Sequence, residues 1–410
     1  MSLAHRLARM SGRDPEENHR AATPLELLFD LTFVVGFSVV STQTALLVER
    51  GHWTAALIGF ALGFFAISWA WVNYAWLASA YDNDDVFFRV ATLVEMVGVL
   101  TIALGLPAFF RSVDAGDHAF NGVMLSGYVV MRVAAVAIWL RAALHDPAHR
   151  RACLTYVITI SAAQVGWIAL FLAGLPLATA LWVIAVLAAV ELAGPVLAER
   201  KDGGTPWHPR HIAERYALLV IIALGEVILG TVLAISAAVD HGGWSVEAVL
   251  IAAGGTSLAF GMWWLYFTLP SGRVIGRYRG RAFGWGYGHI VVFGAIVATG
   301  AGLHAAANFL AGESHIGAVA TVASVAVPVF VFEVTLLTVY SVMLRTMDPF
   351  HTWIFSAAAV VLAGAVLAAA LGASVGVALL IVAASPALIV VSYETVGYRH
   401  EERALRRAGA

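Results

Sequence analysis

Long apolar stretches separated by short polar turns run along the whole chain. A helix needs about 20 apolar residues to cross a hydrocarbon core of about 30 Å. Read on that scale, the chain offers twelve stretches, at 24–48, 53–80, 88–110, 119–143, 152–173, 176–198, 212–239, 246–270, 283–310, 315–342, 350–371 and 374–395. The pattern predicts an all-α polytopic membrane protein with about 12 transmembrane helices.

Basic residues divide unequally between the two sides of this predicted bundle. Twenty of the 24 Lys and Arg residues fall in the N-terminal arm, the C-terminal tail and alternate turns. Arg50 and Arg111 lie on the other side, and Arg132 and Arg215 lie within spans. Because cytoplasmic loops carry the excess of Lys and Arg, the asymmetry predicts an even number of spans with both termini in the cytoplasm.

Composition and motifs argue against a soluble domain, an enzyme and a nucleic-acid-binding protein. The chain is 60% apolar and 12% charged, whereas a soluble domain carries roughly 25% charged residues. It contains none of the phosphate-binding, zinc-protease, serine-elbow or dinucleotide motifs, so we expect no enzyme and no cofactor. A single cysteine, Cys153, excludes an intrachain disulfide. Topology accounts for the basic loops, so no nucleic acid partner is expected.

A weak internal echo relates the two halves of the chain. Glu26 corresponds to Glu214 and Trp71 to Trp264, and Glu191 corresponds to Glu394. The echo predicts a cytoplasmic arm at 1–22, a six-helix repeat at 23–200, a linker at 201–211, a second six-helix repeat at 212–397 and a basic tail at 398–410. Six is even, so the two repeats would be parallel, related by an axis along the membrane normal.

Ionisable residues within the spans are the candidates for function. Glu26 fits a capping box with Thr23, with Pro24 at the first helical position. Asp30 lies one turn deeper, where capping donors have run out. Because a charge at a helix centre costs roughly 2.5–3.5 kcal/mol on insertion scales, we expect Asp30 to face a cation or a wet cavity.

The same argument selects further residues in other spans. The candidates for proton or cation coupling are Asp30, Glu95, Glu226, Glu333 and His289. The candidates for solute binding or ion pairing are Arg132, Arg215, Glu26 and Glu214. Arg132 should pair with Asp30, Glu95 or Glu333, and Arg215 and Glu226, eleven residues apart, should share one face of their helix. The alternative for each is a buried ion pair that only holds helices together.

The turn YDNDDVFFR is a candidate cytoplasmic latch formed by Asp82, Asp84, Asp85 and Arg89. Asp84 or Asp85 should cap the next helix and pair with Arg89, about one turn further on. The turn lacks the rest of an EF-hand loop, so we assign no metal. The tryptophans and the tyrosine of WAWVNYAW are interpreted mostly as packing and interface anchors.

Several strings together resemble one known family. TPLELLFDLTFV, YDNDDVFFR, YVVMRVAAVAIWLRAALHDPAHR, ERYALLVIIALGEVI and YGHIVVFGAIVATGAGL are similar to the bacterial low temperature requirement protein A family, over essentially the whole chain. The resemblance implies a multi-pass protein of the bacterial cell (inner) membrane. It brings no substrate, reaction or cofactor, because the family is named after a growth phenotype.

The sequence favours a proton- or cation-coupled secondary transporter of an unidentified small solute. A passive cation channel and a non-transporting membrane protein with a role in cold adaptation are the alternatives. The expected partners are the lipid bilayer and a small solute or ion, and an oligomer stays open. A cavity lined by Asp30, Arg132 and Glu226 would favour transport, whereas full pairing of these residues in a closed bundle would favour a structural role.

Overall fold

The computed structural model describes residues 7–15, 17, 20–119, 121–201, 203–345 and 349–397. All regular elements in these residues are helical, and twelve helices are long and apolar enough to cross a membrane. The predicted all-α class and number of spans are therefore confirmed. The predicted basic tail at 398–410 lies outside the described residues.

The helix bounds follow the apolar stretches to within a few residues. The helices are α1 (Pro24–Glu49), α2 (Trp53–Tyr81), α3 (Val86–Ala115), α4 (Gly122–His145), α5 (Arg150–Ala173), α6 (Leu177–Ala198), α7 (Pro209–Gly242), α8 (Val246–Phe267), α9 (Ser271–Arg277), η1 (Arg279–Arg281), α10 (Ala282–Leu310), α11 (Ala318–Leu344), α12 (Pro349–Ala370), α13 (Val375–Ser392) and η2 (Tyr393–Gly397). The short α9 and η1 occupy a predicted basic turn.

The chain forms two compact units. The first comprises Met1–Val39 and Ala61–Arg215, and the second comprises Val40–Phe60 and Tyr216–Ala410. Helices α1, α2 and α7 each contribute residues to both units. The predicted division into two parallel repeats stays a prediction.

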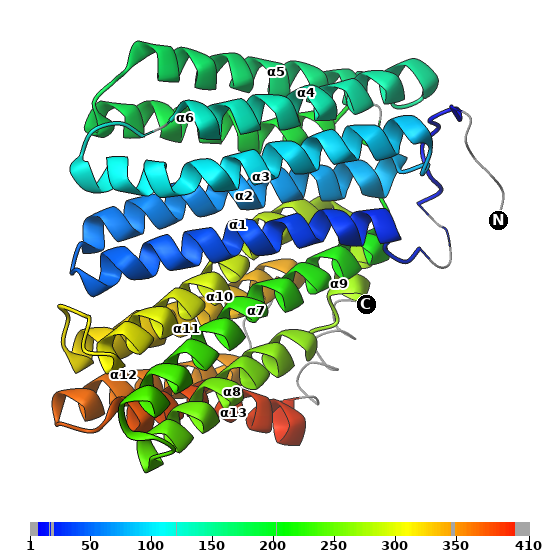
Figure 1. The fold of residues 1–410 in the computed structure, drawn as a ribbon. Coiled ribbons are helices and arrows are strands. Elements are labelled where there is room, and N and C mark those ends of the chain that lie inside the picture. Colours follow the sequence, from blue (N-terminus) through cyan, green and yellow to red (C-terminus); the bar gives the residue numbers. More distant parts are fainter. Residues whose placement is uncertain are drawn as a thin grey trace. The chain divides into compact units, whose positions relative to one another are not determined.

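In the first unit, α3 to α6 follow one another through short turns, and each packs on the next (Figure 1). α3 and α4 approach so closely that a Cβ on Gly98 would lie 2.7 Å from the carbonyl oxygen of Gly127. Small residues allow such backbone contact between membrane helices, where apolar surface alone gives no driving force. The two glycines therefore fix where α3 crosses α4.

The N-terminal segment before α1 closes one end of the first unit. The Arg20 guanidinium is buried and donates to the carbonyl oxygens of Ser79, at 2.6 Å, and Ala78, at 2.8 Å. The backbone N–H of Arg13 donates to the carbonyl of Ala80 at 3.0 Å. These carbonyls belong to the last turn of α2, where the intrahelical donors run out, although the Ala78 carbonyl also accepts from the N–H of Asp82 at 3.0 Å. The segment thus supplies the cap that the end of α2 needs.

In the second unit, α8 packs against α13, and α10, α11, α12 and α13 pack in sequence (Figure 1). Glycines again mark the close crossings. A Cβ on Gly300 of α10 would lie 2.7 Å from the backbone of Glu226 in α7, and one on Gly254 of α8 would lie 3.0 Å from Leu379 in α13. The second unit is therefore also held by direct backbone contact between helices.

Candidate functional site

A buried ionic cluster lies in the first unit where α1 meets the start of α7. We call it the Arg215 cluster; it consists of Glu26, Asp30, Trp71, His211 and Arg215. Arg215 Nη1 lies 3.1 Å from Glu26 Oε1, and Nη2 lies 2.6 Å from Asp30 Oδ1. All three side chains are at most 1% exposed. The expectation that Asp30 faces a cation is confirmed, and the cation is Arg215.

Further donors surround the two carboxylates of the Arg215 cluster. The indole N–H of Trp71 donates to Asp30 Oδ1 at 2.7 Å. His211 Nε2 lies 3.2 Å from Glu26 Oε2. His211 was not among the residues predicted from the sequence, although His211 and Arg215 stand four apart and so share one face of α7. That spacing was the signal available for finding it.

The predicted capping box at the start of α1 is confirmed. The backbone N–H of Thr23 donates to Glu26 Oε2 at 2.7 Å, and the N–H of Glu26 donates to Thr23 Oγ1 at 3.2 Å. Glu26 therefore caps its helix and binds Arg215 at once. Within the part of the chain that the structure describes, Asp30 Oδ2 and Arg215 Nε are buried without a hydrogen-bond partner. The charged groups of the Arg215 cluster are therefore paired, but some of its buried polar atoms have no hydrogen-bond partner among the described residues.

A second ionic cluster in the first unit corrects the expected partner of Arg132. Arg132 Nη2 lies 2.7 Å from Glu191 Oε2 in α6, whereas Asp30 pairs with Arg215. Glu191 was noted only as part of the internal echo, although it lies within a predicted span and the rule for embedded charges applied to it equally. Of the three expected partners Glu95 does interact with the Arg132 charge, but the hydrogen-bonded partner is Glu191, which was left out of the choice.

Two tryptophans bind the Glu191 carboxylate directly, Trp69 from the string WAWVNYAW and Trp167 from α5. Trp69 Nε1 donates to Glu191 Oε2 at 2.6 Å, and Trp167 Nε1 donates to Glu191 Oε1 at 3.1 Å. The Tyr128 hydroxyl accepts from Arg132 Nη2 at 2.7 Å. We call Tyr128, Arg132, Glu191 and these two tryptophans the Arg132 cluster.

Two more polar side chains accompany the Arg132 cluster. Glu95 in α3 is 2% exposed and close enough to Arg132 to interact with its charge. Gln164 lies in α5, one turn from Trp167. Glu95 Oε1, Arg132 Nε, Arg132 Nη1 and both amide atoms of Gln164 are buried without a hydrogen-bond partner among the described residues. Such atoms are rare in native proteins and call for an explanation.

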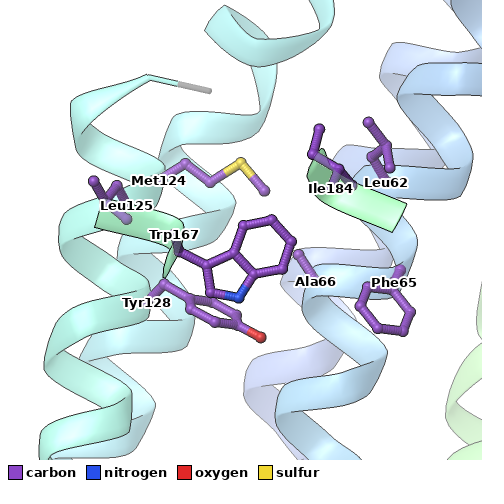
Figure 2. A pocket seen from close by; sticks show the side chains of 8 residues that line it. All are labelled: Leu62, Phe65, Ala66, Met124, Leu125, Tyr128, Trp167 and Ile184. Atoms are coloured by element: carbon purple, nitrogen blue, oxygen red, sulfur yellow. The ribbon is translucent and has the colours of Figure 1, made fainter. Parts of the chain in front are cut away.

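A cavity adjoins the Arg132 cluster, between α2, α4, α5 and α6. Its lining consists of Leu62, Phe65, Ala66, Met124, Leu125, Tyr128, Trp167 and Ile184. Figure 2 shows the Tyr128 hydroxyl and the Trp167 indole nitrogen close together, on the side away from Met124. The cavity is therefore apolar on most sides, and two of its wall residues bind the Arg132–Glu191 pair.

The candidates in the second unit have separate surroundings. His289 Nδ1 lies 2.8 Å from the carbonyl oxygen of Trp285, and Nε2 lies 3.1 Å from the Tyr266 hydroxyl. A carbonyl only accepts, so Nδ1 carries the proton and Nε2 of the neutral ring accepts from Tyr266. The carboxylate oxygens of Glu333 lie 2.8 Å and 3.0 Å from the hydroxyl of Ser385.

Arg215 and Glu226 are both buried in α7, but Arg215 belongs to the first unit and Glu226 to the second. Their predicted common stripe stays a prediction. Glu214, by contrast, is exposed, and its Oε1 accepts from the N–H of Ala22 at 3.4 Å. Among the described residues, no three His, Cys, Asp or Glu side chains gather as a metal site requires.

In the acidic turn, different residues cap α3 and pair with Arg89. The sequence had offered Asp84 and Asp85 as alternatives for these roles. Asp85 is the N-cap of α3 and accepts from the N–H of Phe88 at 2.9 Å. Asp84 instead pairs with Arg89 at 2.7 Å on the surface. Arg141 in α4 also binds Asp85. Although burial opposes it, hydrogen bonding from Arg141 and the N–H of Phe88 lowers the pKa of Asp85 to about 2.

Asp82 in the same turn has the opposite electrostatic character. Burial and the nearby charge of Glu26 raise the pKa of Asp82 to about 6. The Thr23 hydroxyl donates to Asp82 Oδ2 at 3.2 Å, and the N–H of Asp84 donates to Oδ1 at 2.8 Å. One carboxyl group, with a pKa of about 6, therefore accepts hydrogen bonds both from the residue that precedes α1 and from the backbone of its own turn.

Comparison with known proteins identifies relatives of the chain. The family model of the bacterial low temperature requirement A protein (LtrA) matches residues 21–385. An uncharacterized protein of Rhizobium meliloti (strain 1021) is 26% identical over 319 residues, covering 73% of each chain. No solved structure matches the chain significantly. Because the family model spans most of the sequence, including both ionic clusters, the chain belongs to the bacterial low temperature requirement A protein (LtrA) family.

Proposed function

We propose that this chain is a proton- or cation-coupled secondary transporter of a small solute, located in the bacterial cell membrane with both termini in the cytoplasm. The observation that supports this proposal is that the ionic clusters lie within apolar helices and keep buried polar atoms without a hydrogen-bond partner among the described residues. Arg132, Arg215, Asp30 and Glu95 are each at most 2% exposed, yet each retains a polar atom without a hydrogen-bond partner among the described residues. Ionisable groups in such segments typically mark ion, proton or substrate pathways.

The Arg215 cluster suits a coupling role because its pairing can change. Asp30 is the seventh residue of α1, so it lies about 9 Å along the helix from the first residue. If Arg215 released Asp30, the carboxylate would need a proton or another cation to remain buried. Movement of α7 against α1 would therefore be linked to ion uptake. In the two-repeat arrangement that we propose, these are the first helices of the two repeats.

A non-transporting membrane protein is the second candidate, and specific contacts favour it. His289 uses both ring nitrogens on Trp285 and Tyr266, and both oxygens of Glu333 lie beside Ser385. Polar side chains with hydrogen bonds of this kind typically hold membrane helices together. On this view the ionic clusters would specify how helices pair and would conduct nothing.

Flux through purified protein in liposomes separates the candidates. A pH dye inside the vesicles reports proton movement while the proton gradient and then the K⁺ gradient are stepped. The wild type is measured beside Asp30→Asn and Glu226→Gln, with Glu214→Gln as the matched control because that carboxylate is exposed. We expect wild-type and control flux, and loss of flux in the two buried variants with their folding intact.

Other outcomes have distinct meanings. K⁺ conductance that follows the gradient without proton exchange would identify a passive channel. Flux that is equal in all four proteins would remove Asp30 and Glu226 from the coupling path. If no gradient drives flux and the buried variants unfold at lower temperature, the structural candidate is favoured.

A further inference from the structure

We propose that Glu333 is a proton-binding site in the second unit, where it is a neutral carboxylic acid that donates a hydrogen bond to Ser385. Glu333 lies in α11 and Ser385 in α13, and both helices belong to the second unit. Glu333 is 1% exposed and Ser385 is 0% exposed. If the chain is a transporter, its coupling ion is then the proton, and Glu333 is one of the groups that carry it.

The hydrogen bonds around Ser385 need one more proton than an ionised Glu333 would leave. Ser385 Oγ lies 2.8 Å and 3.0 Å from the two carboxyl oxygens of Glu333, and 3.2 Å from the carbonyl oxygen of Ala358 in α12. A carboxylate and a carbonyl only accept, whereas a hydroxyl group has a single proton to donate. With a proton on Glu333, its O–H donates to Ser385 Oγ, and the Ser385 hydroxyl donates in turn to Ala358.

The charge of an ionised Glu333 would have no counterpart. Among the described residues, no Lys, Arg or His side chain lies close enough to Glu333 to interact with a charge there. Asp30 and Glu191, by contrast, each lie within 2.7 Å of an arginine nitrogen. An isolated ionised carboxylate in an apolar interior is so costly that the group takes up a proton instead. At Glu333 a proton therefore takes the place that an arginine has at the other two carboxyl groups.

The helices that pack on α11 supply no compensating charge. These are α10, α12 and α13, and neither they nor α11 contain a Lys, an Arg or a second carboxyl side chain. Their titratable side chains, none of them in α13, are Tyr287, His289, His304, Tyr340 and His351. His289 is neutral, because one ring nitrogen donates to Trp285 and the other accepts from Tyr266. Glu333 therefore stands alone as an acid among uncharged neighbours in these helices.

The geometry favours a proton over a metal ion at this position. The Ser385 and Glu333 oxygens are in direct hydrogen-bond contact, whereas a metal ion would have to stand between them. A hard cation such as Ca²⁺ takes roughly 6–8 oxygen ligands, and only three groups present oxygen atoms here. The positions one turn before and after Glu333 and Ser385 hold buried apolar residues, namely Val329, Leu336, Val382 and Ile389.

Loss of this proton would be coupled to movement of α11 against α13. An ionised Glu333 would be buried with a share of one hydroxyl proton and no cation, so it would have to reach water or a cation. The hydrogen bond from Glu333 therefore joins α11 to α13 only while the proton is bound. The role of the proton as coupling ion rests on the proposed function, whereas proton binding at Glu333 does not and is measured without transport.

Infrared spectroscopy detects the proton directly, because a carboxylic acid has a C=O stretching band that an ionised carboxylate lacks. Spectra of the full-length protein are recorded at neutral pH in dodecyl maltoside, a detergent without a carbonyl group. We expect Glu333→Gln to lose one carboxylic acid band relative to the wild type. Glu313→Gln is the matched control, since Glu313 is exposed in the turn before α11, and it should lose only a carboxylate band.

A second variant tests the hydrogen bond to Ser385. Ser385→Ala removes the acceptor of the carboxylic acid proton, so the band of Glu333 should remain but move to a higher wavenumber. Ser356→Ala is its control, because Ser356 is exposed on α12 and bonds only within its own helix, and it should leave the band in place. Glutamine at position 333 is neutral and can donate to Ser385, so Glu333→Gln should fold; a thermal unfolding scan checks each variant.

Two results would overturn the proton site. One is a Glu333→Gln spectrum that loses a carboxylate band instead of a carboxylic acid band. The other is a carboxylic acid band that does not move in Ser385→Ala. The liposome assay then tests coupling with the same Glu333→Gln protein, whose proton flux should be lost. A carboxylic acid band without any wild-type flux would keep the proton site and reject the transporter, and unchanged flux in Glu333→Gln would remove Glu333 from the coupling path.

Discussion

In the Arg215 cluster the buried Arg215 guanidinium lies against the buried carboxylates of Glu26 and Asp30, so losing that cation should be costly. We expect Arg215→Gln to lower the free energy of unfolding by about 3–5 kcal/mol, because Asp30 would remain buried without its cation, whereas Glu26 would keep Arg20 at 3.5 Å. Glu214→Gln changes the adjacent residue, which is exposed, and should cost less than about 0.5 kcal/mol. Denaturant titration of the purified proteins in detergent measures both. Equal stability of the two variants would contradict the buried pairing.

Asp82 should make stability depend on pH in the opposite direction to most carboxylates. Its pKa is raised to about 6 in the folded protein, whereas an unfolded Asp titrates near about 3.9. The folded state therefore holds the proton more tightly, and this contribution is present below pH about 4 and is lost as pH rises through 6. We expect a loss of about 2 kcal/mol across this window in the wild type.

The substitution Asp82→Asn should flatten that dependence, since the neutral amide can still accept from the N–H of Asp84. Asp84→Asn is the control because Asp84 pairs with Arg89 on the surface, where ion pairs contribute little. Thermal unfolding at several pH values between 4 and 7 measures all three proteins. The raised pKa is refuted if wild type and Asp82→Asn show the same dependence on pH.

Among the helices, the close crossing of α3 and α4 leaves no room for a side chain at Gly98. A Cβ on Gly98 would lie 2.7 Å from both the Gly127 carbonyl oxygen and the N of Met131. Backbone atoms cannot move aside as a side-chain tip can, so Gly98→Ala should cost about 1–3 kcal/mol. Gly364→Ala in α12, where a Cβ meets nothing within 4 Å, should be neutral or gain up to about 1 kcal/mol. Denaturant titration compares them, and a Gly98→Ala protein as stable as Gly364→Ala would argue against the close crossing.

The sequence predicted where helices begin and end far better than which way they face. Only helices and closed barrels can cross a bilayer with their backbone groups satisfied, so a long apolar run leaves few alternatives. The facing direction is harder because lipid and protein interior are both apolar. Leu104 and Leu106 stand two apart in α3, yet one is 76% exposed and the other is 0% exposed. Nothing in the chemistry of leucine distinguishes the two positions.

Polar residues within the spans were the usable markers of direction, and they identified part of the site. Asp30 was expected to face a cation because its burial is costly, and it does. Its partner was not predictable from one chain, since several carboxylates and two arginines within the spans allow many pairings. The roles of Trp69 and Trp167 were missed because an indole packs on apolar neighbours and donates one hydrogen bond at the same time. The apolar packing of an indole can be inferred from the sequence, whereas the acceptor of its hydrogen bond cannot.

For the whole molecule, the proposed orientation makes a direct prediction about exposure at each face of the membrane. Asp117 lies in the turn between α3 and α4, and Ala148 lies in the turn between α4 and α5; both are exposed. With both termini inside, the first turn faces outwards and the second faces the cytoplasm. A membrane-impermeant maleimide on intact cells should therefore label Asp117→Cys at once but Ala148→Cys only after lysis. Native Cys153 is buried, so the wild type gives the background, and the reverse labelling pattern would invert the topology.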